Sequence, residues 1–300
     1  VLSTAGTAPP TQNVATAVNK GFEFGVNYAG GAGSAIRYNI GGNITFINNE
    51  ITNLGTGGEP INSGRIQSAN STVARTDVGH PLASFYGYVT DGLFQTQEEV
   101  TSAAFQNENT APGDIRFRDL NGDNVIDVKD QTYIGNPIPK ATYGLTGDIS
   151  FMGFDLSMFW QGSQGNDIYN GSVRYDFSYV NRPNSSLERW TGPGTSNFEP
   201  RVNLNDPNQN ARVSDRFVED GSYIRLKNLQ LGYTFPKLWM NKAKIKEFRV
   251  YVSAQNLLTF TKYNGLDPEI GTIGGALELG IDKGFYPQAR ILLGGVSLKF

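Results

Sequence analysis

Hydrophobic and polar side chains alternate with a period of two residues along seven segments of the chain. The segments are GFEFGVNY (21–28), AIRYNIGGNITF (35–46), TYGLTGDISF (142–151), FDLSMFWQ (154–161), NLQLGYTF (228–235), FRVYVSAQ (248–255) and LLGGVSLKF (292–300). Successive side chains of a strand point to opposite faces of a sheet. The pattern therefore predicts seven amphipathic β-strands, each with one apolar and one polar face.

The connections between these segments alternate strictly between short and long. Residues 29–34, 152–153 and 236–247 form short turns, whereas residues 49–139, 162–221 and 261–288 form long connections. Outer-membrane barrels have this arrangement, with tight periplasmic turns and large extracellular loops. The predicted fold class is therefore all-β: strands of a large transmembrane antiparallel β-barrel with long extracellular loops, located in the cell outer membrane.

Aromatic side chains beside the short turns support this interpretation, because barrels carry aromatic girdles at the membrane interfaces. The residues concerned are Tyr28, Tyr38, Phe151, Phe154, Tyr233, Phe235 and Phe248. One irregularity is that Arg225 and Lys227 share the parity of the apolar Leu229. We expect them to lie above the bilayer or to mark a bulge.

Seven strands cannot close a single-chain bacterial barrel, which has an even number of strands. An open edge in lipid would leave backbone groups unpaired. We therefore expect residues 1–300 to form the end of a barrel and not the whole of it. A soluble β-sandwich also alternates, so a soluble, calcium-stabilised, β-rich carbohydrate-binding protein remains the alternative.

Composition excludes several functions. The chain of 300 residues carries a net charge of -3 and shows no basic stripe, which argues against a nucleic-acid partner. The absence of cysteine removes disulfides, thiolate catalysis and sulfur-ligated zinc. A Ser-His-Asp triad would have to use the single histidine, His80. Its surroundings, DVGHPLASFYGY, contain no nucleophile elbow, which argues against such a triad. No general acid or base stands out for glycoside hydrolysis, so we expect no enzyme.

The segment DLNGDNVIDVKD, residues 119–130, has the ligand spacing of a calcium loop. Positions 1, 3, 5, 7, 9 and 12 of such a loop supply oxygen ligands, and here they are Asp119, Asn121, Asp123, Val125, Asp127 and Asp130. Position 6 is Asn124 instead of glycine, and position 12 is Asp instead of a bidentate Glu. An Asx-rich turn that binds nothing is the alternative. We expect a structural calcium ion that stiffens the connection 49–139.

Aromatic residues are also frequent in the second long connection, at Tyr169, Tyr175, Tyr179 and Trp190. Exposed rings of this kind stack on sugars or hold a partner. They can equally pack the loop against itself, so no binding residue is assigned among them.

Several segments resemble a known family. They are RTDVGHPLASFYGYVTDGLFQTQEE (75–99), the stretch from Gly113 to Asn170 that contains the calcium-like loop, SYIRLKNLQLGYTFP (222–236), RVYVSAQNLLTFTKYNGLDPEI (249–270) and the last strand, which ends at Phe300. Together they resemble the C-terminal third of a SusC/RagA-type TonB-linked outer-membrane transporter from Bacteroidota. The resemblance covers nearly the whole chain from about residue 20 onward.

The resemblance implies a 22-stranded barrel plugged by an N-terminal domain, capped by a SusD-like surface lipoprotein and driven by TonB. Such transporters import glycan oligomers or peptides, and transporter–lipoprotein pairs can form homodimers. On this interpretation the plug, the TonB-contacting segment and the signal peptide lie upstream of Val1. The chain itself supplies barrel wall, in contact with outer-membrane lipid, and extracellular loops.

Overall fold

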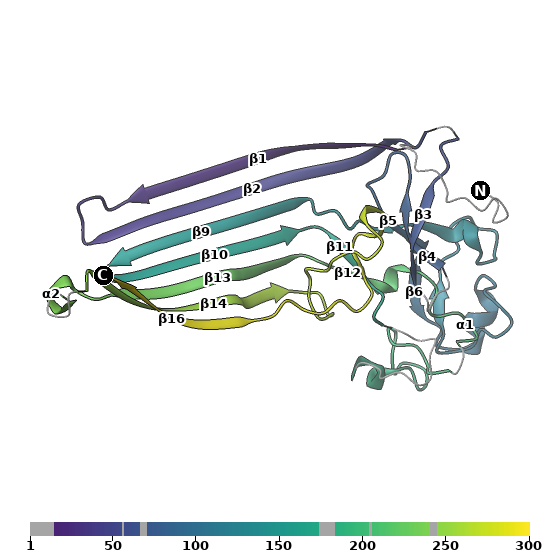
Figure 1. The fold of residues 1–300 in the computed structure, drawn as a ribbon. Helices are drawn as coiled ribbons and strands as arrows, with labels where there is room; N and C mark the ends of the chain where they lie inside the picture. Colours follow the sequence, from purple (N-terminus) through teal and green to yellow (C-terminus); the bar gives the residue numbers. More distant parts are fainter. Residues whose placement is uncertain (1–14, 56, 67–70, 174–183, 204–205, 241–244) are drawn as a thin grey trace, which may run out of the picture.

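The computed structural model describes residues 15–55, 57–66, 71–173, 184–203, 206–240 and 245–300. Its dominant feature is a seven-stranded antiparallel sheet in the order β1-β2-β9-β10-β13-β14-β16 (Figure 1). The strands are β1 (Thr16–Gly30), β2 (Ile36–Asn53), β9 (Ala141–Phe151), β10 (Phe154–Gln164), β13 (Tyr223–Thr234), β14 (Glu247–Thr261) and β16 (Ile291–Lys299). The seven predicted strands and the all-β class are confirmed, and the sheet is open and does not close into a barrel.

The three short turns lie at one end of the sheet and the three long connections at the other (Figure 1). The tightest turn has two residues, Met152 and Gly153, with φ of 47° and 87°. Two positive φ values give the turn twist that suits a two-residue hairpin. The third short turn contains α2 (Lys237–Met240). The strands extend further than predicted: β2 continues to Asn53 because it stays paired with β1 beyond the alternating segment.

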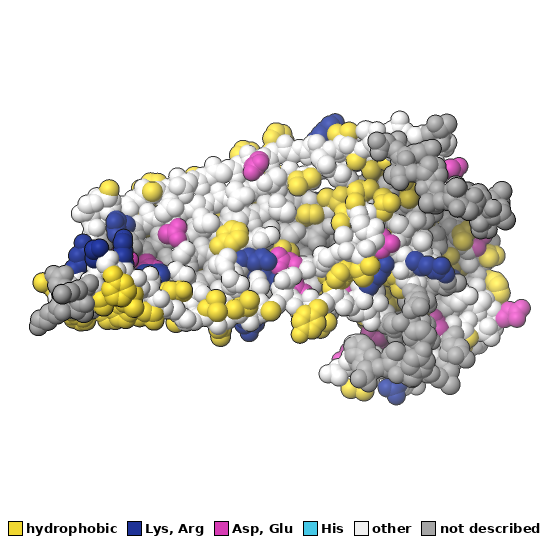
Figure 2. All heavy atoms as spheres, in the orientation of Figure 1, with side chains coloured by type: hydrophobic (Ala, Val, Ile, Leu, Met, Phe, Trp, Pro, Cys, Tyr) yellow, Lys and Arg dark blue, Asp and Glu magenta, His cyan; other side chains and the backbone are white. Residues whose placement is uncertain are grey.

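Strand register places most of the apolar side chains of the seven strands on one side, here called the apolar face. Two rows illustrate this: in one Phe24 pairs with Ile44, and in another Leu156 pairs with both Ile149 and Leu231. The face includes Phe22, Phe24, Val26, Tyr28, Ile40, Phe46, Leu145, Ile149, Leu156, Leu231, Val252, Leu292, Val296 and Leu298. Its side chains are largely exposed, with 73% of Phe22 and 71% of Leu292 accessible, and Figure 2 shows hydrophobic side chains along the lower edge of the sheet.

The opposite side, here called the polar face, carries amides, hydroxyls and charged groups. Asp155 on β10 and Arg249 on β14 form an ion pair of 2.5 Å that passes over Gly232 of the strand between them. Ser157 donates a hydrogen bond of 2.6 Å to Asp148 on β9. These cross-strand bonds stabilise the polar face, as expected for neighbouring positions of a sheet.

The irregular parity at Arg225 and Lys227 marks a bulge. The register between β10 and β13 shifts at Phe159 and Trp160, and that between β13 and β14 shifts between Leu226 and Asn228. The shift puts Leu226 on the apolar face, paired with Leu258, and Arg225 on the polar face, paired with Gln161. The predicted bulge is confirmed. It keeps the apolar face continuous although the alternation reverses within one strand.

The long connections are folded and contain strands that the sequence did not predict. The first holds β3 (Ile61–Ile66), β4 (Ser71–Thr76), β5 (Ser84–Tyr88), β6 (Thr90–Leu93), α1 (Gln97–Ser102), β7 (Ile115–Phe117), the 3-10 helix η2 (Val128–Asp130) and β8 (Gln131–Gly135). The second holds β11 (Asp167–Asn170), η3 (Asn184–Glu188), η4 (Asp215–Phe217) and β12 (Val218–Asp220), and the third holds η6 (Ala276–Glu278) and β15 (Ile281–Asp282). These strands are too short for a reliable period.

Two hydrophobic clusters hold the connections together, in contrast to the exposed sheet. The larger contains Val73, Phe85, Tyr169, Val213, Phe217 and Ile281, which come from all three long connections. The smaller contains Tyr88, Leu93, Ile115, Phe117 and Ile126. The buried core of the described chain thus lies mainly in the connections. No helix in the described part is both long and apolar enough to cross a membrane.

We predict that Gly232→Val destabilises the protein by about 1–3 kcal/mol, the usual cost of overpacking. A Cβ at this position would lie 2.6 Å from Asp155 Oδ1 and closer still to Arg249 Nη2, and so would break the ion pair. The measurement is the unfolding free energy in detergent. Gly25→Val on the same face is the matched control, because a Cβ there meets nothing within 4 Å. Equal effects of the two changes would contradict the prediction.

Candidate functional site

The three long connections interlock into one structure, here called the loop cap (described residues of 54–140, 165–222 and 262–290). β11 of the second connection pairs with β15 of the third, in parallel. Ser63 of the first connection donates a 2.5 Å hydrogen bond to the carbonyl of Leu277 in the third. Thr90 of the first donates a 2.7 Å bond to Asp215 in the second. The cap is therefore a folded unit at one end of the sheet.

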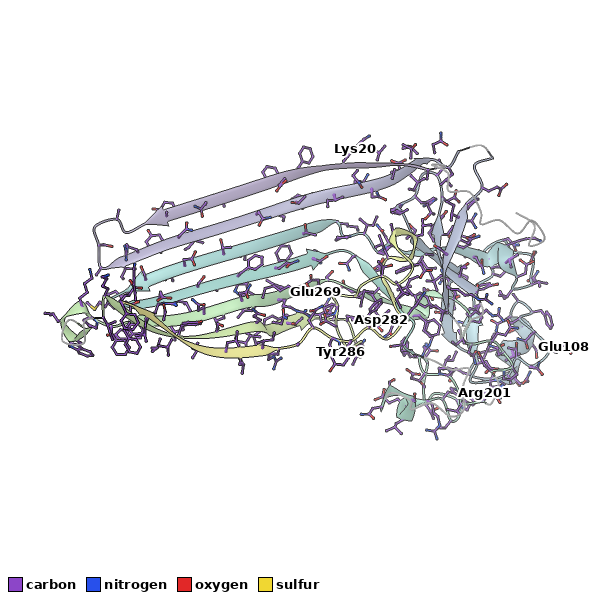
Figure 3. All side chains as sticks on the ribbon, viewed as in Figure 1. Lys20, Glu108, Arg201, Glu269, Asp282 and Tyr286 are labelled. Carbon is purple, nitrogen blue, oxygen red and sulfur yellow. The ribbon has the colours of Figure 1, made fainter. Side chains whose placement is uncertain are left out.

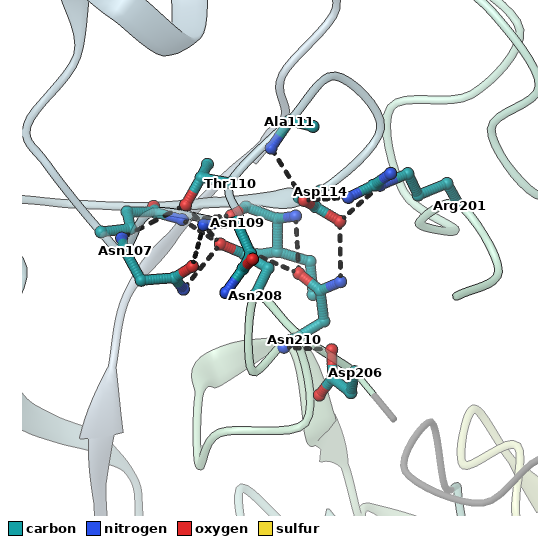
Figure 4. Close-up of polar contacts among 11 residues, drawn as sticks. Asn107, Asn109, Thr110, Ala111, Asp114, Arg201, Asp206, Asn208 and Asn210 are labelled. Atoms are coloured by element: carbon teal, nitrogen blue, oxygen red, sulfur yellow. Dashed lines mark hydrogen bonds and ion pairs between the residues drawn. The ribbon is translucent and has the colours of Figure 1, made fainter. Parts of the chain in front are cut away.

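A buried polar network joins the first and second connections (Figure 4). Asn208 is fully buried, and its side-chain oxygen accepts hydrogen bonds from Thr110 (2.7 Å) and Gln106 (3.2 Å). Asp114 forms two bonds of 2.9 Å to the Arg201 guanidinium. Such bidentate pairs are strong and fix geometry. The network holds the two connections in register with each other.

An ionic cluster, here called the latch, fixes the third connection to the polar face of the sheet. Arg225 is 3% exposed, and its guanidinium binds Asp267 at 2.6 Å and Glu269 at 2.5 Å. Lys227 binds Glu269 at 2.7 Å, and the Tyr223 hydroxyl donates to the same carboxylate at 2.9 Å. In Figure 3, Glu269 lies where the strands meet the cap. Burial raises the pKa of Asp267, but bonds from Arg225 and from two backbone N–H groups lower it more, so its net pKa lies below the ordinary value.

A cavity of about 990 Å³ lies between the polar face and the loop cap. Its floor includes Thr45, Thr142, Gln161, Ser163 and Tyr223 from four neighbouring strands. The cap contributes residues 137–139, 268–272 and 279–280. Ligand-sized pockets in proteins reach roughly 1,000 Å³. This cavity is the candidate binding site, and the latch sets the position of the cap segment on one of its sides.

The calcium-like loop 119–130 forms a compact turn whose carboxylates bind its own backbone. Asp119 accepts N–H bonds from Gly122 (2.7 Å) and Asn124 (2.8 Å), and Asp130 accepts from Leu120 and Asp127 (both 2.8 Å). Asn124 adopts φ of 64°, the left-handed conformation expected at position 6.

The other predicted ligands of that loop lie beside these two carboxylates. Asn121 donates to Asp123 at 2.9 Å, Asp127 caps η2, and Val125 is exposed. Within the described residues, no three or more His, Cys, Asp or Glu side chains are grouped to hold a metal ion. The carboxylates in this geometry fit an Asx-rich turn, and calcium binding stays a prediction.

Two of the four aromatic candidates of the second connection, Tyr169 and Trp190, pack inside the cap. Tyr169 is 2% exposed and contacts Phe85 and Phe217. Trp190 donates its indole N–H to Gln95 at 3.1 Å. Tyr175 and Tyr179 lie outside the described residues. Of the two interpretations, packing of the loop against itself holds for Tyr169 and Trp190.

Sequence reasoning missed the latch and the Asn208 network. The sequence contained one indication of the latch. Arg225 and Lys227 occupy positions where the alternation predicts apolar residues, and charged side chains that are buried need partners. Nothing in the sequence indicates that Asp267 and Glu269, about forty residues later, are those partners. The sequence gives no indication of the Asn208 network, because isolated asparagines are common in loops.

The chain is similar to TonB-dependent receptors over nearly its whole length. It is 31% identical to TonB-dependent receptor P3 of Formosa agariphila over 305 residues and 32% identical to TonB-dependent receptor SusC of Bacteroides thetaiotaomicron over 301 residues. These matches cover 99% and 98% of this chain, but 30% and 27% of the relatives. Among solved structures, it matches the one described as "Structure of the RagAB peptide transporter" with a TM-score of 0.76 and 22% identity, covering 100% of this chain and 31% of that chain. No family model matches the chain.

The open antiparallel sheet with its exposed apolar face defines a piece of barrel wall. The resemblance to SusC/RagA-type TonB-dependent receptors is confirmed, and the chain spans about 30% of the length of the curated relatives it matches. The relatives are named as receptors and the solved neighbour as a transporter, in agreement with the prediction of a non-enzymatic protein. The predicted location in the outer membrane is the location of TonB-dependent receptors.

We predict that the latch holds at neutral pH and opens in acid. Because the folded pKa of Asp267 is lowered, its contribution to stability is present above the ordinary value of 3.8 and is lost as the pH falls through the folded pKa. Hydrogen exchange of residues 262–290, corrected for intrinsic rates, should show protection at pH 7 and pH 5 that declines below about pH 4.

Arg225→Met is the matching variant. It should remove this protection at every pH, at a cost of about 3–5 kcal/mol, because Asp267 then remains buried without a cation and Glu269 keeps only Lys227. Protection in wild type that is unchanged down to pH 2, or retained in the variant, would show that the latch does not hold the connection.

Proposed function

We propose that this chain is part of the wall and the extracellular loops of an outer-membrane TonB-dependent transporter. The observation that carries the proposal is the exposed apolar face that runs unbroken across seven strands. A soluble protein rarely exposes an apolar patch larger than several hundred Å², so the soluble carbohydrate-binding alternative loses support. In lipid the same face is favourable, and the polar face then lines the interior.

The aromatic residues at the short-turn end support the orientation of the chain in the membrane. Phe154 and Tyr233 lie 4.6 Å apart, and Phe235 stacks on Phe248 at 4.8 Å between ring centroids. Tyr28 and Tyr38 form a further pair at 5.8 Å. The rings gather at one level of the sheet, as in the interfacial girdle of a barrel. The short turns then face the periplasm and the loop cap faces outward.

Substitution on the two faces tests this proposal in the full-length protein that carries the chain. Val252, 59% exposed on the apolar face, and its neighbour Ser253 on the polar face form a matched pair. Val252→Arg should reduce stability in lipid bilayers by about 2–4 kcal/mol, because the charge would enter hydrocarbon. Ser253→Arg should cost much less. Equal effects of the two substitutions would contradict a lipid-facing Val252.

We further propose import of glycan oligomers or peptides together with a SusD-like surface lipoprotein, with TonB engaged by parts of the protein beyond this chain. The cap supports the lipoprotein partner, because the Asn208 network and the two hydrophobic clusters make the loops one preformed platform. The similarity to TonB-dependent receptors and to the RagAB peptide transporter supports the transport role. Copurification of a lipoprotein with the tagged full-length transporter tests the partnership, and its absence at every stage of purification would count against it.

We also propose a structural calcium ion in loop 119–130, supported by the ligand spacing and by the left-handed Asn124. Carboxylate oxygens that accept N–H bonds keep further lone pairs for an ion. The ion should raise the melting temperature of the full-length protein, and EDTA should reverse this. Asp119→Asn combined with Asp123→Asn should abolish the shift, while Asp91→Asn, outside the loop, should retain it. A melting temperature that is insensitive to calcium in wild type would show that the loop is an Asx-rich turn only.

A further inference from the structure

The third short turn differs from the other two in its charge. Its segment KLWMNKAKIKE (237–247) contains four lysines and one glutamate, whereas the turns 29–34 and 152–153 contain no charged residue. Two of the four lysines, Lys237 and Lys246, belong to the part of the chain that the structure describes, and both are exposed. Neither ammonium group forms an ion pair with a described residue. The turn therefore presents positive charge that is free to attract an anion.

Lys246 lies on the apolar side of the sheet. It precedes Glu247 and shares the parity of Phe248, which pairs with Leu298 of the apolar face. Its ammonium group donates one hydrogen bond of 2.7 Å to the carbonyl of Phe300. An ammonium group has three N–H donors, so two of them remain for an acceptor outside the chain.

Two other cations at this end of the sheet lie on the polar face, beside acidic groups. Arg249 binds Asp155 at 2.5 Å, and Lys299 pairs in register with Glu247. In the proposed orientation these groups face the interior of the barrel. They are therefore directed away from lipid, in contrast to Lys246.

Trp239 of α2 extends the aromatic residues of the apolar face onto the turn. Its ring lies 6.2 Å from that of Phe235 between centroids, and Phe235 contacts Tyr233 at 5.0 Å. Tyr233 pairs with Phe154 on the apolar face. Trp239 is still 63% exposed, and the neighbouring Leu238 is 81% exposed. Tryptophan is enriched where a membrane meets water, because its indole has an apolar body and a polar N–H.

Backbone hydrogen bonds attach both ends of the turn to the sheet. The N–H of Phe235 donates to the carbonyl of Phe248 at 2.9 Å, and the N–H of Lys246 donates to the carbonyl of Lys299 at 2.8 Å. α2 therefore lies at a fixed level just beyond the strand ends (Figure 1). In the proposed orientation this is the level of the periplasmic head groups.

Charge and apolar surface lie side by side at this end. Figure 2 shows Lys and Arg side chains gathered next to hydrophobic side chains at the short-turn end of the sheet. Segments that lie in a membrane interface have this composition: Trp and Leu enter the acyl boundary, and lysines meet the head groups. Anionic lipids attract such lysines, whereas a lipid without net charge gains little from them.

We infer that Lys237, Leu238, Trp239 and Lys246 form a binding site for an anionic phospholipid of the periplasmic leaflet. The lysine ammonium groups bind the phosphate of the head group, and Leu238 and Trp239 contact the upper part of the acyl chains. The inference rests on the proposed membrane-wall function and on its orientation. It assigns a ligand to the end of the sheet opposite the loop cap.

The test measures quenching of Trp239 fluorescence in the full-length protein, reconstituted into phosphatidylcholine nanodiscs. The discs contain equal mole fractions of either brominated phosphatidylglycerol, which is anionic, or brominated phosphatidylcholine, which has no net charge. Bromine quenches tryptophan only at short range, and subtraction of the signal of the Trp239→Phe variant isolates Trp239. Brominated phosphatidylglycerol should quench Trp239 more strongly, and about 0.5 M salt should reduce the difference by screening.

Lysine variants identify the groups that cause this preference. Lys237→Gln and Lys246→Gln should each lower the relative affinity for the anionic lipid about fivefold, the equivalent of about 1 kcal/mol. Lys20→Gln is the matched control, because it removes the same charge from β1 at the loop-cap end of the sheet (Figure 3). It should leave the quenching of Trp239 unchanged.

Three results would overturn the inference. The first is equal quenching by the two brominated lipids, and the second is a preference that persists when Lys237→Gln and Lys246→Gln are combined. In both cases Trp239 would still lie in lipid, and the membrane wall would stand. The third is no quenching by either lipid, which would place Trp239 away from the membrane. Failure of the membrane-wall proposal itself has a different result, equal effects of Val252→Arg and Ser253→Arg.

Discussion

Everything in this chain depends on seven strands keeping their apolar side chains on one side of a single sheet. Side-chain direction has a period of two, so a register slip of one residue would carry every apolar side chain of a strand to the polar face. The pairing prevents this throughout: Phe24 with Ile44, Leu156 with Leu231, and Val250 with Val296. Where the alternation of β13 reverses, the bulge at Lys227 restores it. A continuous apolar face is the condition for a wall that stands in lipid.

The polar face and the loop cap are under a different constraint, because their buried polar and charged groups need hydrogen-bond or ion-pair partners within the protein. Arg225 sits on the polar side of the bulge, where it meets Asp267 and Glu269 of the third connection. The bulge therefore has two consequences. It keeps the Leu226 side chain on the apolar face. It also places the buried Arg225 guanidinium against the third connection, which covers the cavity. Removing one partner of such a buried pair is costly, so the wall and the cap are coupled energetically at this position.

The core of the described chain lies mainly in the connections. Phe85, Tyr169 and Ile281 belong to three different connections, yet they share one hydrophobic cluster. The Asn208 network adds directional bonds between the first two connections. Long loops without internal structure are uncommon unless they have a function, and here they fold against one another. The result is a preformed cap over a cavity whose floor is set by strand register alone.

The sequence by itself determined the strands, their two faces, the alternation of short and long connections, and the irregularity at Arg225 and Lys227. These features are local, because period-two alternation and turn residues are visible within a few neighbouring positions. In loop 119–130 it placed Asn124 at position 6, and asparagine tolerates the left-handed conformation found there. Only the tertiary structure decided which residues share a row of the polar face, which carboxylates meet Arg225, and that Tyr169 is buried and not exposed. These relations join residues from tens to about two hundred positions apart, where no local pattern specifies the partner. Register and loop packing settle them, because they bring distant polar groups close enough to bind.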